Sequence, residues 1–278
     1  MKVLRGKVAV ITGGASGIGR SVAERAATEG MKVVLADIEE GALKVTTEAL
    51  MSSGAEVEAV VTDVSNGSEV ETLRDQALER FGAVHLVHNN AGVGVGGLLW
   101  TVSEADWKWI LGVNLWGVIH GIRTFVPLLV DQGEGHVVNT ASEAGLTSPG
   151  LLGPYNATKH AVTAISETLY RDLRFSGSPV GVSVLCPGFV RTGIGESERT
   201  RPHWAPKPDD DPAAAVVRDV IHQLVAGGIE PNVVADRVFD AVRSDTFYIL
   251  THEHSRPMVE ARMVDILEGR FPSDMPVV

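Results

Sequence analysis

Tyr155 and Lys159 stand four residues apart in a segment with helical periodicity, and Ser142 comes shortly before them. Pro154 suits the first turn of a helix, and apolar residues recur after it at helical spacing. Residues four apart lie on the same face of a helix, so we expect the lysine ammonium beside the tyrosine ring. An ammonium favours the phenolate, and we therefore expect the pKa of Tyr155 to fall below its reference of about 10. Such a phenol is a usable general acid/base for an alcohol and carbonyl pair.

The pair also has a simpler interpretation. Tyrosine and lysine at this spacing occur by chance in many amphipathic helices, where the lysine is a surface residue. Only motifs elsewhere in the chain can distinguish a catalytic pair from a chance pair in an amphipathic helix.

The elements that would position these residues alternate along the chain. Short β-branched apolar runs are typical of buried parallel strands, and the segments between them show helical spacing. We expect strands at residues 7–12, 32–37, 56–61, 83–88, 136–141, 180–185 and 246–252. We expect helices after the glycine-rich residues 12–19 and at residues 41–51, 68–81, 103–111, 112–129, 154–175, 213–226, 232–243 and 256–267. The alternation predicts an α/β fold, a doubly wound parallel sheet of about seven strands with helices on both faces, in a single domain of residues 1–278.

Composition narrows the class of protein. The 278 residues are 44% hydrophobic and 21% charged, as in an ordinary globular protein. The formal charge of −11 argues against nucleic acid or an anionic membrane as the main partner. One cysteine, Cys186, excludes an internal disulfide and agrees with a reducing cytosol. We see no signal-peptide pattern and no run of about 20 apolar residues, and we expect a cytoplasmic protein.

A glycine-rich turn follows the first expected strand and opens a helix, as a phosphate-binding turn does. Its sequence, TGGASGIG at residues 12–19, differs from the common G-x-G-x-x-G spacing, but glycines still let the backbone approach a pyrophosphate at a helix N-terminus. Asp37 ends the second strand, where a carboxylate accepts hydrogen bonds from the adenosine ribose hydroxyls and repels a 2′-phosphate. No basic residue follows it closely, which favours NAD over NADP. The alternative is a turn or helix-capping aspartate.

Taken together, these motifs resemble those of the short-chain dehydrogenases/reductases, a family with a Rossmann-type fold. The matching features, in chain order, are TGGASGIG, NNAG at residues 89–92, Asn114, Ser142, Tyr155-x-x-x-Lys159 and Pro187-Gly188. The resemblance covers about residues 5–190 and extends more weakly to about residue 250.

The resemblance implies a catalytic role for four residues. Tyr155 would be the acid/base, and Lys159 would lower its pKa and hold the nicotinamide ribose. Ser142 would hydrogen-bond the substrate oxygen and stabilise charge that develops there. Asn114 would help hold a water that links Lys159 to solvent. Without the resemblance, an asparagine in an apolar helix is better interpreted as a satisfied buried amide.

The resemblance also implies a dinucleotide site. Asp63 would bind the adenine amino group beside Val64, Asn90 would line the cleft or steady the sheet, and Val190 and Thr192 would contact the nicotinamide carboxamide. The complete implied set is Gly13, Ser16, Gly17, Ile18, Gly19, Asp37, Asp63, Val64, Asn90, Ala91, Gly92, Tyr155, Lys159, Pro187, Gly188, Val190 and Thr192.

These features predict an NAD-dependent oxidoreductase that interconverts a hydrophobic secondary alcohol and its ketone. The substrate class is inferred from apolar residues expected to border the cleft: Val93, Val95, Leu98, Leu99, Leu146, Leu151, Leu152, Phe189 and Trp204. A loop at residues 188–212 would close over the substrate. Two alternatives stay open, an NADP-dependent carbonyl reductase and a non-catalytic NAD(H)-binding regulatory protein on the same fold.

The carboxyl end departs from the family pattern. Residues 253–278 extend beyond the last expected strand, where many members stop, which puts the assembly in doubt. We expect a homodimer or homotetramer, with the Tyr155 helix and its predecessor at the interface, because Ala157, Ala161 and Ala164 would allow close packing. We reject a metal site at His252-Glu253-His254, since neither the spacing nor a third ligand fits zinc. The clustered tryptophans, of which Trp100 could reach the cleft, are expected to pack helices: Trp100, Trp107, Trp109 and Trp116.

Overall fold

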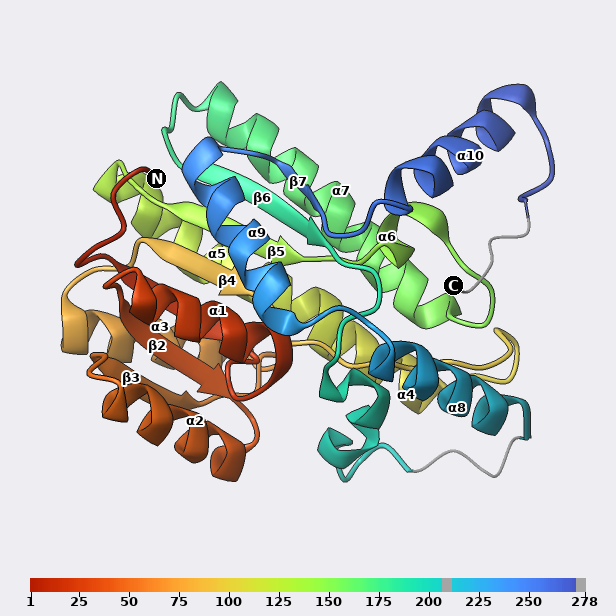
Figure 1. Ribbon diagram of the computed structural model, residues 1–278, viewed down its shortest axis with the longest axis horizontal. Coiled ribbons are helices and arrows are strands. Elements are labelled where there is room, and N and C mark those ends of the chain that lie inside the picture. The colour runs from red at the N-terminus through yellow and green to blue at the C-terminus, as the bar shows by residue number, and fades with distance from the viewer. Residues whose placement is uncertain (207–211, 274–278) are drawn as a thin grey trace.

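The computed structural model describes residues 1–206 and 212–273. Seven strands form one parallel sheet in the order β3-β2-β1-β4-β5-β6-β7 (Figure 1). The strands are β1 (Val8–Thr12), β2 (Lys32–Asp37), β3 (Val57–Val61), β4 (Leu86–Asn89), β5 (His136–Thr140), β6 (Gly181–Cys186) and β7 (Tyr248–Leu250). The expected doubly wound sheet is therefore confirmed, and each strand lies within about three residues of its predicted bounds.

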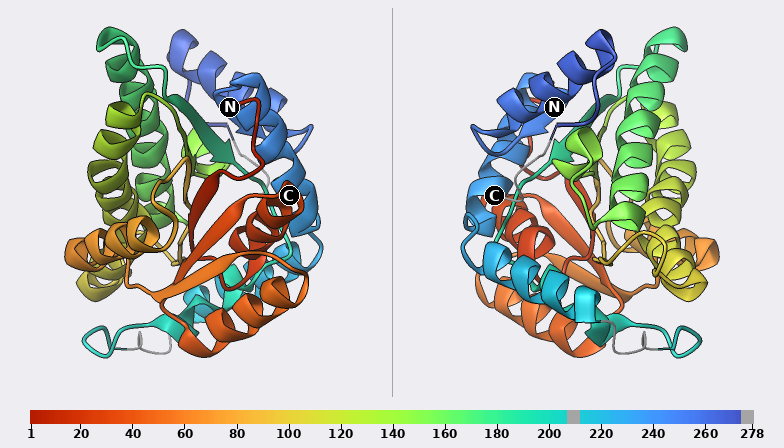
Figure 2. Two further views of the ribbon diagram at one scale, coloured as in Figure 1. Left: turned by 90° about the vertical axis from the view of Figure 1, so that its left-hand side faces the viewer. Right: turned by 90° about the vertical axis from the view of Figure 1, so that its right-hand side faces the viewer.

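Helices cover both faces of the sheet (Figures 1 and 2). One face packs against α1 (Gly17–Thr28), α2 (Glu40–Ser52) and α9 (Pro231–Ser244). The other packs against α3 (Gly67–Phe81), α5 (Gly117–Gln132) and α7 (Gly153–Phe175). Side chains of β1 alternate between the two cores, with Ala9 and Ile11 toward α1 and with Val8 and Val10 toward α3 and α5.

Further elements lie around the carboxyl edge of the sheet. They are α4 (Glu104–Ile110), α6 (Ala144–Thr147), the 3₁₀ segment η2 (Gly193–Thr200), α8 (Pro212–Ala226) and α10 (Ser255–Glu268). The expected loop at residues 188–212 thus contains a helical segment, and its residues 207–211 lie outside the described part of the chain. Helix α10 extends away from the sheet beyond α6 (Figure 1), and residues 274–278 of the expected tail also lie outside the description.

The two helices expected at residues 103–111 and 112–129 are joined without a break. A π-helical segment, η1 (Leu111–Trp116), connects α4 to α5, and a single-turn π-bulge is a feature often found at functional sites. Within the described residues, the run Glu104–Gln132 is long and apolar enough to cross a membrane by length and composition alone. The core helices of globular proteins meet the same criterion, and here Phe125 and Leu129 pack against the sheet.

Close approach of α5 to the sheet depends on Gly121. A Cβ at this position would overlap the carboxamide of Asn89, at the end of β4. Asn89 donates a hydrogen bond to Asn139 Oδ1 at 2.8 Å, and Asn139 in turn donates to Ser166 Oγ on α7 at 3.0 Å. This buried amide chain ties the centre of the sheet to the helix that carries Tyr155 and Lys159.

Candidate active site

A cleft opens at the carboxyl ends of the strands, where the strand order reverses between β1 and β4. This topological switch point is the usual ligand site of open α/β sheets. The cleft runs from the glycine turn and the end of β2 to the ends of β5 and β6. Most of the cofactor residues implied by the sequence line it: Gly13, Ser16, Gly17, Ile18, Asp37, Asp63, Val64, Asn90, Ala91, Gly92, Tyr155, Lys159, Pro187, Gly188, Val190 and Thr192.

The glycine turn is shaped by close backbone contacts. Gly13 and Gly17 have φ values of 64° and 52°, in the left-handed region that favours glycine. A Cβ on Gly13 would lie 2.9 Å from the Cα of Ala91, and one on Gly17 would lie 2.9 Å from Thr192 Cγ2. Gly19 does not line the cleft, because it packs against the carbonyl of Gly13 and so shapes the turn from behind.

The N-terminus of α1 points its donors into this turn. Ser16 occupies the N-cap position, yet its side chain makes no capping hydrogen bond. The first backbone N–H groups of a helix need acceptors from outside the helix, and its dipole favours an anion there. Asn90 fixes the turn to β4, since its Nδ2 donates to the Thr12 carbonyl at 3.0 Å. These residues therefore fit a pyrophosphate.

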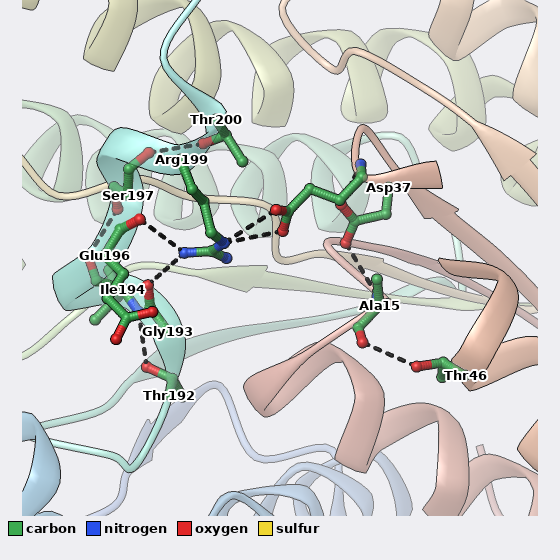
Figure 3. A network of polar contacts seen from close by, with 11 residues as sticks. Ala15, Asp37, Thr46, Thr192, Gly193, Ile194, Glu196, Ser197, Arg199 and Thr200 are labelled. Carbon is green, nitrogen blue, oxygen red and sulfur yellow. Dashed lines mark hydrogen bonds and ion pairs between the residues drawn. The ribbon is translucent and has the colours of Figure 1, made fainter. Parts of the chain in front are cut away.

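Asp37 is held beside the glycine turn, at the same end of the cleft. Its Oδ2 accepts from the Ala15 N–H at 3.0 Å, and its Oδ1 accepts from the Glu39 N–H at 3.1 Å. Thr46 steadies the same loop by donating to the Ala15 carbonyl (Figure 3). Burial raises the pKa of Asp37, and the backbone donors oppose that rise. The carboxylate therefore caps a local turn, as the alternative interpretation of Asp37 from the sequence expected. It also lines the cleft, as a ribose-binding residue would.

Ser142, Tyr155 and Lys159 meet at the other end of the cleft, as the sequence predicted. Ser142 follows β5, and its hydroxyl donates to the Pro187 carbonyl at 3.3 Å and accepts from the Ala144 N–H at 3.2 Å. Lys159 is only 2% exposed. Its Nζ donates to the Thr140 carbonyl at 2.9 Å and lies 5.5 Å from the centroid of the Tyr155 ring. A surface lysine is therefore excluded.

The expected fall in the pKa of Tyr155 is wrong for this chain. Burial raises the pKa of Tyr155 above its usual value, and Ser142 opposes the rise by hydrogen bonding. The ammonium faces the tyrosine ring and the Thr140 carbonyl, so its attraction does not outweigh the loss of water around the phenolate. Burial also lowers the pKa of Lys159 itself to about 8.

Asn114 lies in the π-helical segment and is fully buried. Its Oδ1 accepts from the Val93 N–H at 2.8 Å, and its Nδ2 donates to the Val93 carbonyl at 2.9 Å. The side chain therefore forms the satisfied buried amide of the simpler interpretation, and it does not line the cleft. Asn114 Oδ1 and Lys159 Nζ both lie close to Gly92. A Cβ built on this glycine would be 3.4 Å from the oxygen and 3.6 Å from the nitrogen.

The segment from Thr192 to Arg201, which we name the lid, crosses the cleft. Arg199 Nε donates to both carboxylate oxygens of Glu39 at 3.1 Å, and Arg199 also donates to the carbonyls of Gly193 and Glu196 (Figure 3). The Ser197 hydroxyl accepts from the Gly94 N–H at 2.9 Å. The lid is thereby attached to Glu39, near Asp37, and to Gly94 across the cleft.

The end of the lid is fixed by a buried ion pair. Arg201 bonds Asp106 of α4 at 2.7 Å, and both side chains are 5% exposed. The guanidinium also lies 4.6 Å from the ring centroid of Trp109, which lines the cleft. Of the four clustered tryptophans, Trp109 lines the cleft, whereas Trp100 is 81% exposed and does not line it.

Sequence reasoning missed the residues that attach the lid. Glu39 and Arg199 are 160 positions apart, and Asp106 and Arg201 are 95 apart, so no local pattern pairs them. It also missed Glu143 and Met258 in the cleft wall. Of the apolar residues expected there, four do not line the cleft: Leu98, Leu99, Leu146 and Leu151. In the described ranges, 1–206 and 212–273, no group of three His, Cys, Asp or Glu residues could hold a metal ion.

Comparison with known proteins identifies relatives along the whole chain. A family model described as short chain dehydrogenase matches residues 7–203. A short-chain dehydrogenase/reductase from Burkholderia phymatum, solved in complex with NAD, is 50% identical with a TM-score of 0.97, and the match covers 99% of each chain. The 1-deoxy-11-beta-hydroxypentalenate dehydrogenase of Streptomyces avermitilis is 36% identical over 95% of this chain and 91% of its own length. The CLA biosynthesis dehydrogenase/reductase of Lactiplantibacillus plantarum is 34% identical over 98% of this chain and 97% of its own.

The contact between Arg199 and Glu39 predicts a measurable change in lid mobility. In Arg199→Ala, amide hydrogen exchange at residues 193–201 should be about two- to fivefold faster, the range expected for a partly exposed ion pair. Arg171→Ala, which removes an exposed pair with Glu167 on α7, is the matched control and should leave the lid unchanged. Equal lid exchange in the parent and in Arg199→Ala would contradict the attachment.

Proposed function

The chain belongs to the short-chain dehydrogenase family, and we propose that it is an NAD-dependent oxidoreductase that interconverts a hydrophobic secondary alcohol and its ketone. One observation carries the proposal. Ser142, Tyr155 and the buried Lys159 meet in the same cleft as the glycine turn and Asp37. A proton-transfer group and a dinucleotide site that share one cleft suit hydride transfer between a carbinol and nicotinamide.

NAD fits the residues present. The left-handed glycines and the uncapped start of α1 suit a pyrophosphate, and the Asp37 carboxylate suits ribose hydroxyls. Arg199 is a cation near this end, but Glu39 already binds its guanidinium, so a 2′-phosphate would meet two carboxylates first. The Burkholderia phymatum relative was solved with NAD, which supports the same preference here.

The cleft wall supports an apolar substrate. Lining residues on the Ser142 side include Val93, Val95, Trp109, Leu152, Phe189, Trp204 and Met258. Such side chains give a pocket its shape, while a few polar groups orient the ligand. The names of the relatives, dehydrogenases of hydroxylated compounds among them, support a hydroxyl group as the reacting centre.

The mechanism follows from the positions of three side chains. When bound, NAD supplies the hydride acceptor and a positively charged ring. The Ser142 hydroxyl binds the substrate oxygen, and Tyr155 accepts the hydroxyl proton during oxidation or donates it during reduction. Because burial raises the pKa of Tyr155, positive charge in the cleft has to stabilise its phenolate, and the Lys159 ammonium is this chain's own contribution.

The remaining organisation is part of the same proposal. All described elements form one domain. The lid closes the cleft, and the extension from residue 253 contributes Met258 to the cleft wall. A homodimer would pair α5 and α7 of two copies, because Ala157 and Ala164 are exposed on α7 and leave room for a second helix.

Two alternatives are tested with the same protein. An NADP-dependent carbonyl reductase would use Arg199 for the 2′-phosphate once Glu39 released it. A non-catalytic NAD(H)-binding protein would retain the glycine turn without turnover. The presence of Ser142, Tyr155 and Lys159 in the cleft favours the enzyme.

Replacing Tyr155 with phenylalanine tests the acid/base assignment. Tyr155→Phe should lower kcat by about 10²- to 10⁴-fold, the usual range for a general acid/base, with NADH affinity within about twofold of the parent. The rate of NADH formation from a panel of secondary alcohols and fluorescence titration with NADH provide the two measurements. Tyr170→Phe, on an exposed turn of the same helix, should retain full activity. Turnover by Tyr155→Phe at the parental rate would contradict the mechanism.

Cofactor selection is tested at Asp37. Asp37→Ala removes a charged acceptor, so kcat/KM with NAD should fall about 10- to 100-fold while use of NADP improves relative to NAD. Kinetics with both cofactors on one alcohol measure the ratio. Glu40→Gln removes an exposed carboxylate at the start of α2 and should leave the ratio unchanged. If Asp37→Ala kept the parental ratio, the selection would lie elsewhere.

A further inference from the structure

Glu143 is a buried carboxylate beside the reacting groups that the mechanism does not use. It directly follows Ser142, is 8% exposed and forms part of the cleft wall. Its backbone N–H donates to the Pro187 carbonyl at 2.9 Å, which fixes its position between the ends of β5 and β6. Oε2 lies 3.3 Å from His254 Nε2, whereas Oε1 is buried and has no hydrogen-bond partner among the described residues.

The contact with His254 does not explain why a carboxylate is buried here. The His254 side chain is 43% exposed, and ion pairs with such an exposed partner contribute little to stability. A buried charged oxygen without a donor costs more than such a pair contributes. The neighbouring His252 is engaged elsewhere, because its Nδ1 lies 3.2 Å from the Gly188 N–H and 2.8 Å from the Thr251 hydroxyl. Within the described ranges, 1–206 and 212–273, Oε1 is thus left without a donor.

The cleft is where such a donor would come from. Phe189 and Met258 make the cleft wall near Glu143 mainly apolar. In such a wall, the Glu143 carboxylate is a polar group that can orient a ligand. Ser142 and Glu143 are adjacent in the chain and both line the cleft, so one small molecule can contact both. Side-chain rotation of the kind common on binding would turn Oε1 toward it.

We propose that Glu143 binds a second hydroxyl of the substrate, so that the preferred substrates are apolar diols or hydroxyketones with the two oxygens a few bonds apart. This inference rests on the proposed function. The second hydroxyl donates a hydrogen bond to the carboxylate and stays unreacted, while the first loses its proton to Tyr155 and its hydride to NAD. A hydroxyl suits the site better than an ammonium, because a cation loses more on leaving water for an apolar cleft.

A matched set of substrates tests the proposal. 1-Phenylethanol, 1-phenylethane-1,2-diol and 2-amino-1-phenylethanol share the same carbinol and differ in the second group. With NAD, the parent should oxidise the diol with a higher kcat/KM than the mono-alcohol. In Glu143→Gln, kcat/KM for the diol should fall about 10- to 100-fold, as expected when a hydrogen bond to a charged group is lost, while the value for the mono-alcohol stays within about twofold.

The controls separate recognition from folding. Glu253→Gln, an exposed carboxylate on the same carboxyl-terminal segment as His254, should keep the parental ratio. Glu143→Asp keeps the negative charge and should retain part of the preference for the diol. If Glu143→Gln does not fold, Glu143→Asp is used in its place. An equal fall for both alcohols would assign Glu143 a structural role and overturn the proposal, as would a parent without diol preference. Preference for the amino alcohol would overturn the assignment of a hydroxyl.

Failure of the proposed function is distinguishable from failure of this inference. If the parent oxidises none of the three alcohols, the proposed reaction is wrong for this substrate class. Binding of the diol and the mono-alcohol to parent and Glu143→Gln, measured by calorimetry in the presence of NADH, then decides the inference. Tighter diol binding that is lost in Glu143→Gln would support it, and equal affinities would overturn it.

Discussion

The buried ammonium of Lys159 is the constraint on which the active site depends. An ammonium that leaves water needs acceptors or negative charge around it, or its pKa falls. Here it donates to the carbonyl of Thr140 at the end of β5 and lies over the ring of Tyr155. Because these partners replace its water only in part, its pKa falls to about 8. The fold therefore keeps the Lys159 ammonium beside Tyr155, where proton transfer requires a positive charge. Burying this charge lowers the stability of the folded state.

Three parts of the fold build the cleft around that charge. The buried chain Asn89–Asn139–Ser166 joins β4 and β5 to α7, and Gly121 lets α5 approach this chain closely. The glycine turn brings a helix N-terminus to the far end of the same cleft. The lid then covers the space between, attached to Glu39 on one side and to Asp106 on the other. The contacts of the buried chain and of the lid therefore join elements that are distant in sequence.

Much of this could be predicted from sequence, because the signals were local. β-branched runs predicted the strands, the turn at residues 12–19 lay between β1 and α1, and Asp37 ended β2 as expected. The spacing of Tyr155 and Lys159 correctly placed both on α7. The pKa of Tyr155 was not predictable from spacing, since burial raises it, the hydrogen bond with Ser142 lowers it, and only the structure shows which effect is larger. The pairs that attach the lid and the contact of Glu143 with His254 are likewise long-range, and no local pattern indicates them.

The most direct test of this account is the pH dependence of stability in the parent and in Lys159→Met, from urea unfolding between pH 7 and pH 10.5. The native pKa of Lys159, about 8, lies below the reference of 10.5, so the unfolded state binds more protons across this window. The stability of the parent should therefore rise with pH relative to Lys159→Met, by about 3 kcal/mol over the window. If the two stability profiles stayed parallel from pH 7 to pH 10.5, Lys159 would have an ordinary pKa, and the buried cation at the centre of this account would not exist.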